Sequence, residues 1–184
     1  MIELFSEEPI ADALSYKKAF AGDTLNTMFM ASKLGSSCGY ITRLAHDPFS
    51  DYLLREWNEQ GIDVSTVKRV YGFTGVHFIA QMANGERDFL YYRDGSAAGT
   101  MVPEDLNTEY IGSARILHIS AILQAVSETC KDTLLTAVQM ASELGVLVSY
   151  DTNLRLNLTS ASQAFEAMME ILPYVDLVMP SFPE

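Results

Sequence analysis

The chain alternates short apolar runs with longer segments of helical period, and this alternation limits its fold more than any other feature. The apolar runs occupy 40–44, 116–119, 146–150 and 176–179. The helical segments occupy 23–34, 50–60, 127–144 and 160–172. Short apolar runs separated by helices are typical of buried strands in a parallel sheet. The pattern therefore predicts a layered α/β fold, with a right-handed βαβ unit across 116–150.

One stretch departs from this alternation. Residues 73–83 and 86–93 form two strand-like runs joined by Asn84-Gly85, which favours a hairpin with a two-residue turn. That register places His77 opposite Tyr92. His77 would then lie on the opposite face from Tyr91 and Arg93, unless a bulge or a three-residue loop shifts the pairing. The hairpin is either a lid or dimer contact, or a decorated edge of the main sheet.

Composition excludes several classes of function. The chain has 12 Lys and Arg against 24 Asp and Glu, a net charge of −12, which argues against nucleic-acid binding and against a basic membrane-surface helix. No apolar run reaches the roughly 18 residues that a membrane span needs. The first 11 residues carry three Glu and no Lys or Arg, unlike a secretory signal. Cys38 and Cys130 lie far apart and are expected to be reduced thiols, so we expect a cytoplasmic protein without nucleic-acid or membrane partners.

Two segments carry polar residues where an α/β sheet binds ligands, beyond the carboxyl ends of its strands. Gly22–Asn26 opens the first helix: the glycine allows close approach, and Asp23 and Asn26 could bind hydroxyls, although Asp23 could instead merely cap the helix. Asp151–Arg155 follows a predicted strand. Its Arg155 could bind a carboxylate or phosphate, or the segment could be a solvated loop.

Arg93 and His118 are ambiguous as well, and Arg93, like Arg155, could bind a carboxylate or phosphate or lie in a solvated loop. Tyr91 and Arg93 are two residues apart in the hairpin, so they share a face of the strand. His118 lies inside a predicted strand, which favours a structural core histidine over a catalytic base. The chain lacks the sequence motifs of Walker-type nucleotide hydrolases, serine hydrolases, zinc proteases and dinucleotide-binding folds.

Taken together, these strings resemble the ribokinase-like (PfkB) carbohydrate kinases, most closely their 2-keto-3-deoxygluconate kinase branch. The resemblance covers nearly the whole chain, and the GDTLNT and YYR strings are its most specific parts. The strings are Ala21–Thr27 (AGDTLNT), Gly72–Gly75 (GFTG), Phe89–Ala97 (FLYYRDGSA), Leu117–Ser120 (LHIS) and Asp151–Arg155 (DTNLR).

The resemblance implies one ribokinase-like domain across 1–184. It would have a mainly parallel sheet with helices on both faces and a small β lid built from about 1–19 and 70–93. In that family the lid commonly also forms a dimer contact, so a homo-oligomer through the lid is one arrangement it allows. The implied substrate-binding residues are Gly22, Asp23, Thr24, Leu25, Asn26, His77, Tyr91, Arg93, Ile122 and Arg155. Asn153, Arg155 and Glu184 would reach ATP and its phosphates.

Three departures from the family pattern make the chain look incomplete. The family's catalytic aspartate lies in a Gly-rich loop that would follow Glu184, so no catalytic residue and no metal ligand is expected in this chain. The strand that usually precedes the Met1–Leu4 string is missing. Ser181-x-x-Glu184 occupies the place where many relatives have Asn-x-x-Glu near Mg²⁺.

The expected activity is transfer of the ATP γ-phosphoryl group, with Mg²⁺, to the primary hydroxyl of 2-keto-3-deoxygluconate. Arg93, Arg155 and Tyr91 would bind the carboxylate of this sugar acid. Two alternatives remain: a related kinase for fructose or ribose, and a non-catalytic module that binds a sugar acid. On either reading, a sheet without its flanking strands would expose edges, and the segment could fail to fold alone.

Overall fold

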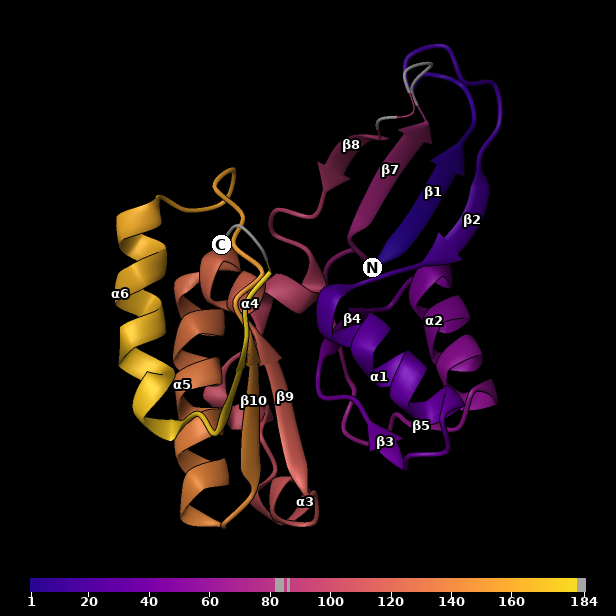
Figure 1. Ribbon diagram of the computed structural model, residues 1–184. Coiled ribbons are helices and arrows are strands. Elements are labelled where there is room, and N and C mark those ends of the chain that lie inside the picture. Colours follow the sequence, from indigo (N-terminus) through magenta and orange to yellow (C-terminus); the bar gives the residue numbers. More distant parts are fainter. Residues whose placement is uncertain (82–84, 86, 182–184) are drawn as a thin grey trace. The chain divides into compact units, whose positions relative to one another are not determined.

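The computed structural model describes residues 1–81, 85 and 87–181. The chain forms two compact units, Met1–Ala98 and Gly99–Glu184. Each unit has its own sheets and helices (Figure 1). The α/β class predicted from the alternation of segments is confirmed.

Ten elements make up the first unit: β1 (Ile2–Ser6), β2 (Lys17–Phe20), α1 (Asp23–Lys33), β3 (Cys38–Gly39), β4 (Arg43–Ala45), α2 (Pro48–Glu59), β5 (Ile62–Asp63), β6 (Lys68–Val70), β7 (Val76–Gln81) and β8 (Arg87–Tyr92). A short 3-10 helix, η1 (Ala97–Thr100), runs across the junction. The second unit continues with η2 (Pro103–Asp105), α3 (Thr108–Gly112), β9 (Ile116–Ser120), α4 (Ala121–Val126), α5 (Glu128–Glu143), β10 (Leu147–Asp151), α6 (Ala161–Ile171), η3 (Leu172–Tyr174) and β11 (Leu177–Met179).

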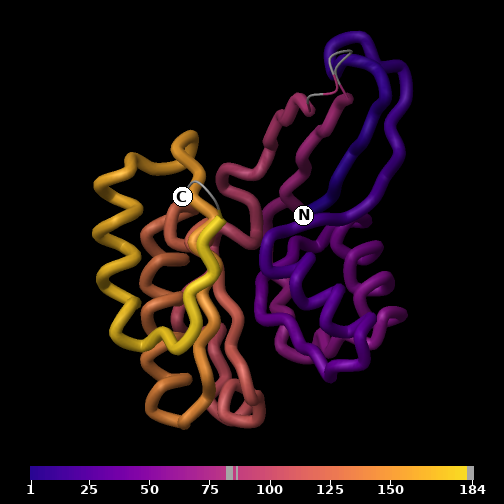
Figure 2. Tube along the Cα trace, viewed as in Figure 1, coloured from indigo at the N-terminus to yellow at the C-terminus, as the bar shows by residue number. Residues whose placement is uncertain are grey.

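A four-stranded sheet, which we call the lid sheet, brings distant segments of the first unit together. Its strand order is β2-β1-β7-β8, with β1 and β7 parallel and the two outer pairings antiparallel. Figure 2 shows the indigo N-terminal segment lying beside the magenta strand β7. The two segments assigned to a lid by resemblance thus form one sheet, while their action as a lid stays a prediction.

The hairpin β7–β8 forms as predicted, but its predicted register was wrong by one residue. Val76 pairs with Tyr92, and His77 pairs with Tyr91. This pairing leaves an odd number of residues between Gln81 and Arg87, which a two-residue turn cannot provide. The predicted turn residue Asn84 lies outside the described residues. Because the pairing shifts, His77, Tyr91 and Arg93 fall on the same face.

Helices α1 and α2 pack over a core formed by buried side chains from both helices and from the short strands. These side chains are Ile2, Leu25, Leu44, Leu53, Trp57 and Ile62. The helix predictions for 23–34 and 50–60 are confirmed to within two residues at each end.

The strand predicted at 40–44 is instead two short strands, β3 and β4, on either side of residues 40–42. The backbone N–H of Tyr40 donates to Asp63 O at 3.0 Å, next to β5. The N–H of Lys68 donates to Thr42 O at 3.1 Å, at the start of β6. The backbone therefore changes its pairing partner within this stretch, and the continuous apolar run concealed that change.

The second unit is built on a parallel three-stranded sheet in the order β11-β10-β9. Helix α5 packs against β9 and β10, and α6 packs against α5 (Figure 1). The predicted βαβ unit is confirmed. The Oγ of Ser127 accepts the N–H of Cys130 at 3.2 Å and caps α5, while Ser160 and Gln163 form the predicted capping box of α6.

Neither unit contains a helix that is both long and apolar enough to cross a membrane, as far as the described residues go. Cys38 and Cys130 are both free thiols, as predicted.

Candidate functional site

One face of the lid sheet gathers four polar and aromatic side chains, Glu3, His77, Tyr91 and Arg93, which we call the lid-face cluster. Glu3 pairs with His77 between β1 and β7, and His77 pairs with Tyr91 between β7 and β8. The His77 ring stacks on Tyr91 with centroids 5.6 Å apart, and the Arg93 guanidinium lies 5.3 Å from the Tyr91 centroid. The structure therefore brings together the three predicted residues of this region.

His77 is the buried member of the cluster. Its side chain is 6 % exposed, and its Nε2 lies 3.2 Å from Glu3 Oε2. Burial lowers the pKa of His77, and the Glu3 carboxylate only partly opposes this effect. His77 is therefore a neutral imidazole at neutral pH, and Arg93 is the cation of the cluster. The Nδ1 of His77 has no hydrogen-bond partner within the part of the chain that the structure describes.

Glu3 was missed as a site residue. Its place in the cluster depends on the pairing of β1 with β7, strands more than 70 residues apart in the chain. The alternation of side chains along β1 could have indicated which face Glu3 occupies. It could not indicate which strand lies beside it.

The start of α1 carries the predicted GDTLNT residues and has no side-chain cap. Gly22 is the N-cap residue, and Asp23 is the first residue of the helix. The alternative in which Asp23 merely caps the helix is therefore wrong. The Gly22 N–H donates to Asn26 Oδ1 at 3.4 Å, and Thr24 Oγ1 lies 3.3 Å from the buried Tyr40 hydroxyl.

Leu25 differs from its neighbours in this segment. Its side chain is 1 % exposed and belongs to the core of the first unit. Leu25 can therefore contact a ligand only through its backbone, and its predicted substrate contact stays a prediction. A Cβ added at Gly22 would lie 3.2 Å from Leu25 Cβ, so glycine also keeps this turn close to the core.

The α1 start and Arg93 lie at the same end of the lid sheet. Phe20, two residues before Gly22, pairs with Ile2, and Ile2 pairs in turn with Val76. Val76 pairs with Tyr92, the residue immediately before Arg93. The polar groups at the start of α1 and the Arg93 cation thus lie at one end of the same sheet.

The second unit holds the other predicted residues around an open cleft of about 350 Å³. Ile122, Asn153 and Arg155 all line this cleft between α4, α6 and the segment after β10. Asn153 has φ of 28°, in the left-handed region that asparagine tolerates better than most residues. Arg155 is exposed, and its Nη1 donates to Leu154 O at 3.1 Å, so its present contact is local.

The other positions considered in the sequence analysis belong neither to the first unit's candidate site nor to the cleft of the second unit. His118 Nδ1 lies 3.2 Å from Ser149 Oγ on the neighbouring strand, which favours the structural role. Glu184 lies outside the described residues. Within 1–81, 85 and 87–181, no three His, Cys, Asp or Glu side chains come together as a metal site.

A family model for pfkB carbohydrate kinases matches residues 2–184. The chain belongs to the pfkB family of carbohydrate kinases. Its ribokinase-like fold is the one shared by solved members. A PfkB protein from Polaromonas sp. JS666 is 28 % identical, has a TM-score of 0.92 and matches 97 % of this chain and 62 % of its own.

Named relatives within the family differ in substrate. A probable fructokinase-4 from Arabidopsis thaliana is 33 % identical over 168 residues, 91 % of this chain and 51 % of that protein. A 2-dehydro-3-deoxygluconokinase from Thermotoga maritima is 25 % identical with a TM-score of 0.93, over 98 % of this chain and 56 % of that one. The chain thus spans about half the length of the curated relatives it matches.

Proposed function

We propose that the protein carrying this chain is an ATP-dependent kinase for the sugar acid 2-keto-3-deoxygluconate, phosphorylating its primary hydroxyl. This chain would carry mainly the substrate-binding half. The observation that supports this choice is the lid-face cluster, in which Arg93 lies over Tyr91 beside the neutral His77.

A carboxylate is the group that Arg93 would recognise best. A guanidinium binds a carboxylate through two parallel hydrogen bonds, and such charge-assisted bonds are roughly twice as strong as neutral ones. Stacking on Tyr91 restricts the orientation of the Arg93 side chain before the ligand arrives. The Tyr91 hydroxyl adds a hydrogen-bond donor beside the guanidinium. A neutral sugar would gain little from Arg93.

The uncapped start of α1 complements this cation. No N-cap side chain accepts its first-turn N–H groups, although the Gly22 N–H donates to Asn26 Oδ1, and the Asp23 carboxylate can accept hydrogen bonds from sugar hydroxyls. We propose that the lid sheet covers the sugar while the α1 start binds its hydroxyls.

ATP would be held by the second unit. Asn153 and Arg155 at the 350 Å³ cleft offer an amide and a guanidinium to phosphate oxygens, which fits the donor set that phosphates require. When bound, ATP supplies the γ-phosphoryl group. Among the described residues, no three His, Cys, Asp or Glu side chains come together to hold Mg²⁺.

The test is a pair of arginine variants at the two ends of β8, Arg87 being its first residue and Arg93 the residue after its last. Arg93→Ala should weaken binding of 2-keto-3-deoxygluconate about 10- to 100-fold, because it leaves the carboxylate without its charged partner. Arg87→Ala, at the exposed opposite end of β8, is the matched control and should leave affinity unchanged. Isothermal titration calorimetry measures both. Equal affinities of Arg93→Ala and the wild type would contradict the carboxylate assignment.

Fructose phosphorylation is the second candidate, because the Arabidopsis and Solanum tuberosum relatives, each 33 % identical, are named fructokinases. The ratio of kcat/KM for the two sugars, measured by ADP release, separates the candidates. A fructokinase would prefer fructose, and Arg93→Ala would change its kcat/KM by less than about twofold. Sugar-acid binding without ADP release would instead indicate a non-catalytic module.

We propose two further properties. Strand β8 is an edge strand whose Phe89 and Tyr92 are exposed, which supports a homo-oligomer formed through the lid sheet. Sedimentation velocity of a Phe89→Ser variant would test it. The acidic composition and the free thiols support a cytoplasmic location.

A further inference from the structure

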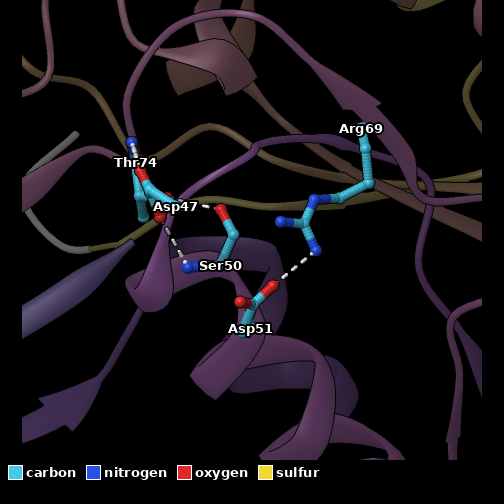
Figure 3. A network of polar contacts seen from close by, with 5 residues as sticks. All are labelled: Asp47, Ser50, Asp51, Arg69 and Thr74. Atoms are coloured by element: carbon cyan, nitrogen blue, oxygen red, sulfur yellow. Dashed lines mark hydrogen bonds and ion pairs between the residues drawn. The ribbon is translucent and has the colours of Figure 1, made fainter.

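The N-terminus of α2 is tied to the segment that enters β7 by a single carboxylate. Asp47 Oδ1 accepts the N–H of Ser50 at 2.8 Å, which caps the helix. The same carboxylate accepts the N–H of Thr74 at 2.7 Å and the Thr74 hydroxyl at 2.8 Å (Figure 3). One side chain therefore fixes both the helix start and the backbone of Thr74.

Two of the three members of this network are buried, and Asp47 is partly buried. Ser50 is 0 % exposed and Thr74 is 5 % exposed, and their hydroxyls lie in hydrogen-bond contact with each other. Burial alone would raise the pKa of Asp47, but the hydrogen bonds from Ser50 and Thr74 outweigh it and lower the pKa. Asp47 is thus a carboxylate at neutral pH, and its bonds to Thr74 are charge-assisted.

Gly75, the residue after Thr74, lies against Arg93. A Cβ added at Gly75 would lie 3.2 Å from Arg93 Cβ and 3.3 Å from Ser96 Oγ. The φ angle of Gly75 is not in the left-handed region, so backbone conformation does not require glycine there. The requirement is space for Arg93. The Arg93 carbonyl also accepts the Ser96 N–H at 2.9 Å, so Ser96 closes the other side of the contact.

We infer that Asp47 is a positioning residue for Arg93, acting through its hydrogen bonds to the backbone and hydroxyl of Thr74 and the close contact of Gly75 with the base of the arginine side chain. This inference rests on the proposed function, in which Arg93 binds the substrate carboxylate. A displacement of a few tenths of an ångström at Arg93 Cβ becomes larger along the side chain toward the guanidinium. A bidentate pair depends on geometry, so such a displacement weakens it.

The first test is a double-variant cycle of Gly75→Ala with Arg93→Ala, in the protein at its natural length. The ligands are 2-keto-3-deoxygluconate and its neutral carboxamide, with affinities from calorimetry. Gly75→Ala should weaken sugar-acid binding about 3- to 10-fold and change carboxamide binding by less than about twofold. In the Arg93→Ala background, Gly75→Ala should have no further effect. A general loss of folding would weaken both ligands equally.

The second test removes the hydrogen bond that the Thr74 hydroxyl donates to Asp47. Thr74→Val keeps the side-chain shape but loses the hydroxyl, and it should reproduce the selective loss. Thr74→Ser retains the hydroxyl and should restore the wild-type affinity ratio. Asp51→Asn is the control: Asp51 lies on the same helix, pairs with Arg69 at 2.8 Å and does not contact Thr74 (Figure 3). It should leave both affinities unchanged.

The outcomes separate this inference from the proposed function. If Arg93→Ala weakens sugar-acid binding while Gly75→Ala and Thr74→Val do not, the positioning role is wrong and the function stands. If Gly75→Ala weakens binding equally in both backgrounds, Gly75 acts on another group, and the inference is again wrong. If Arg93→Ala has no effect, the carboxylate assignment fails and the inference fails with it.

Discussion

The two helices of the first unit begin in opposite ways. Helix α2 begins with a side-chain cap from Asp47, a proline at its first position and a second set of hydrogen bonds to Thr74. Helix α1 begins at Gly22 with no side-chain cap at all. Both helices pack on the same core, so the difference is confined to their first turns.

We infer from this contrast that the first N–H groups of α2 serve stability, whereas those of α1 serve ligand binding. The first N–H groups of a helix carry a partial positive charge, and a cap uses them for stability. In α2 they are used in this way and the start of the helix is tied to β7. In α1 they remain available at the same end of the lid sheet as Arg93, where a ligand can take them. We therefore expect changes at Asp47 to affect stability most and changes at Gly22 and Asp23 to affect binding most.

Removing the cap of α2 should have the largest effect on stability. Asp47→Ala should lower the free energy of unfolding by about 2–3 kcal/mol, because the cap is lost and the buried Thr74 N–H loses its acceptor. Urea unfolding followed by circular dichroism measures this loss.

Gly22→Ala is the matched change at the start of α1. The φ of Gly22 is 175°, which suits any residue, and an added Cβ would make a tight contact with Leu25, so the stability of the variant should change by less than about 1 kcal/mol. Equal losses of unfolding free energy for Asp47→Ala and Gly22→Ala would show that the two helix starts do not differ in their contribution to stability.

The contribution of Asp47 should also depend on pH. Hydrogen bonding lowers its pKa below the ordinary value of 3.8, so the folded state favours the ionised form. Its stabilisation is present in full well above pH 3.8 and is lost as the pH falls through 3.8 toward the lower pKa of the folded state. The difference in unfolding free energy between wild type and Asp47→Asn should therefore shrink below pH 3.8. A difference that stays constant from pH 6 to pH 3 would mean that the charge of Asp47 does not matter.

The sequence indicated most of the local structure, because local signals determine it. The capping box at Ser160 and the N-cap at Ser127 depend on residues within one helical turn, and both are present. The split of the predicted strand 40–44 was missed, since it depends on which distant strand each backbone group pairs with. The hairpin register was missed for a related reason: a strong turn dipeptide suggested one loop length, while the pairing of both strands determines another.

The candidate site was predicted in part. Residue types and spacing pointed to Tyr91 and Arg93, and the resemblance added His77. Neither indicated Glu3, whose role depends on a parallel pairing between distant strands. Nothing in the spacing around Asp47 indicated that it also holds Thr74, because that contact depends on how two segments fold together.

Removing the acidic group at the start of α1 should affect binding more than stability. Asp23→Asn should weaken sugar binding about 10-fold, equivalent to about 1.4 kcal/mol, because a carboxylate accepts hydroxyl hydrogen bonds more strongly than an amide does. Stability should fall by no more than about 1 kcal/mol, the usual value of an acidic residue in the first turn. Calorimetry and urea unfolding of the same sample measure both quantities. Asp51→Asn, also in the first turn of its helix, should leave binding unchanged.

The smallest expected effect is also the most direct test of the comparison, because it gives α1 the kind of cap that α2 has. Gly22→Ser and Gly22→Ala add the same Cβ beside Leu25, but only serine adds a hydroxyl that can accept a first-turn N–H. The Gly22→Ser variant should therefore be more stable than the Gly22→Ala variant by about 0.5–1 kcal/mol. It should also bind sugar a few-fold more weakly, because the serine hydroxyl competes with the sugar for the same N–H groups. If the two variants bind equally, the ligand does not use those N–H groups, and the missing cap of α1 needs another explanation.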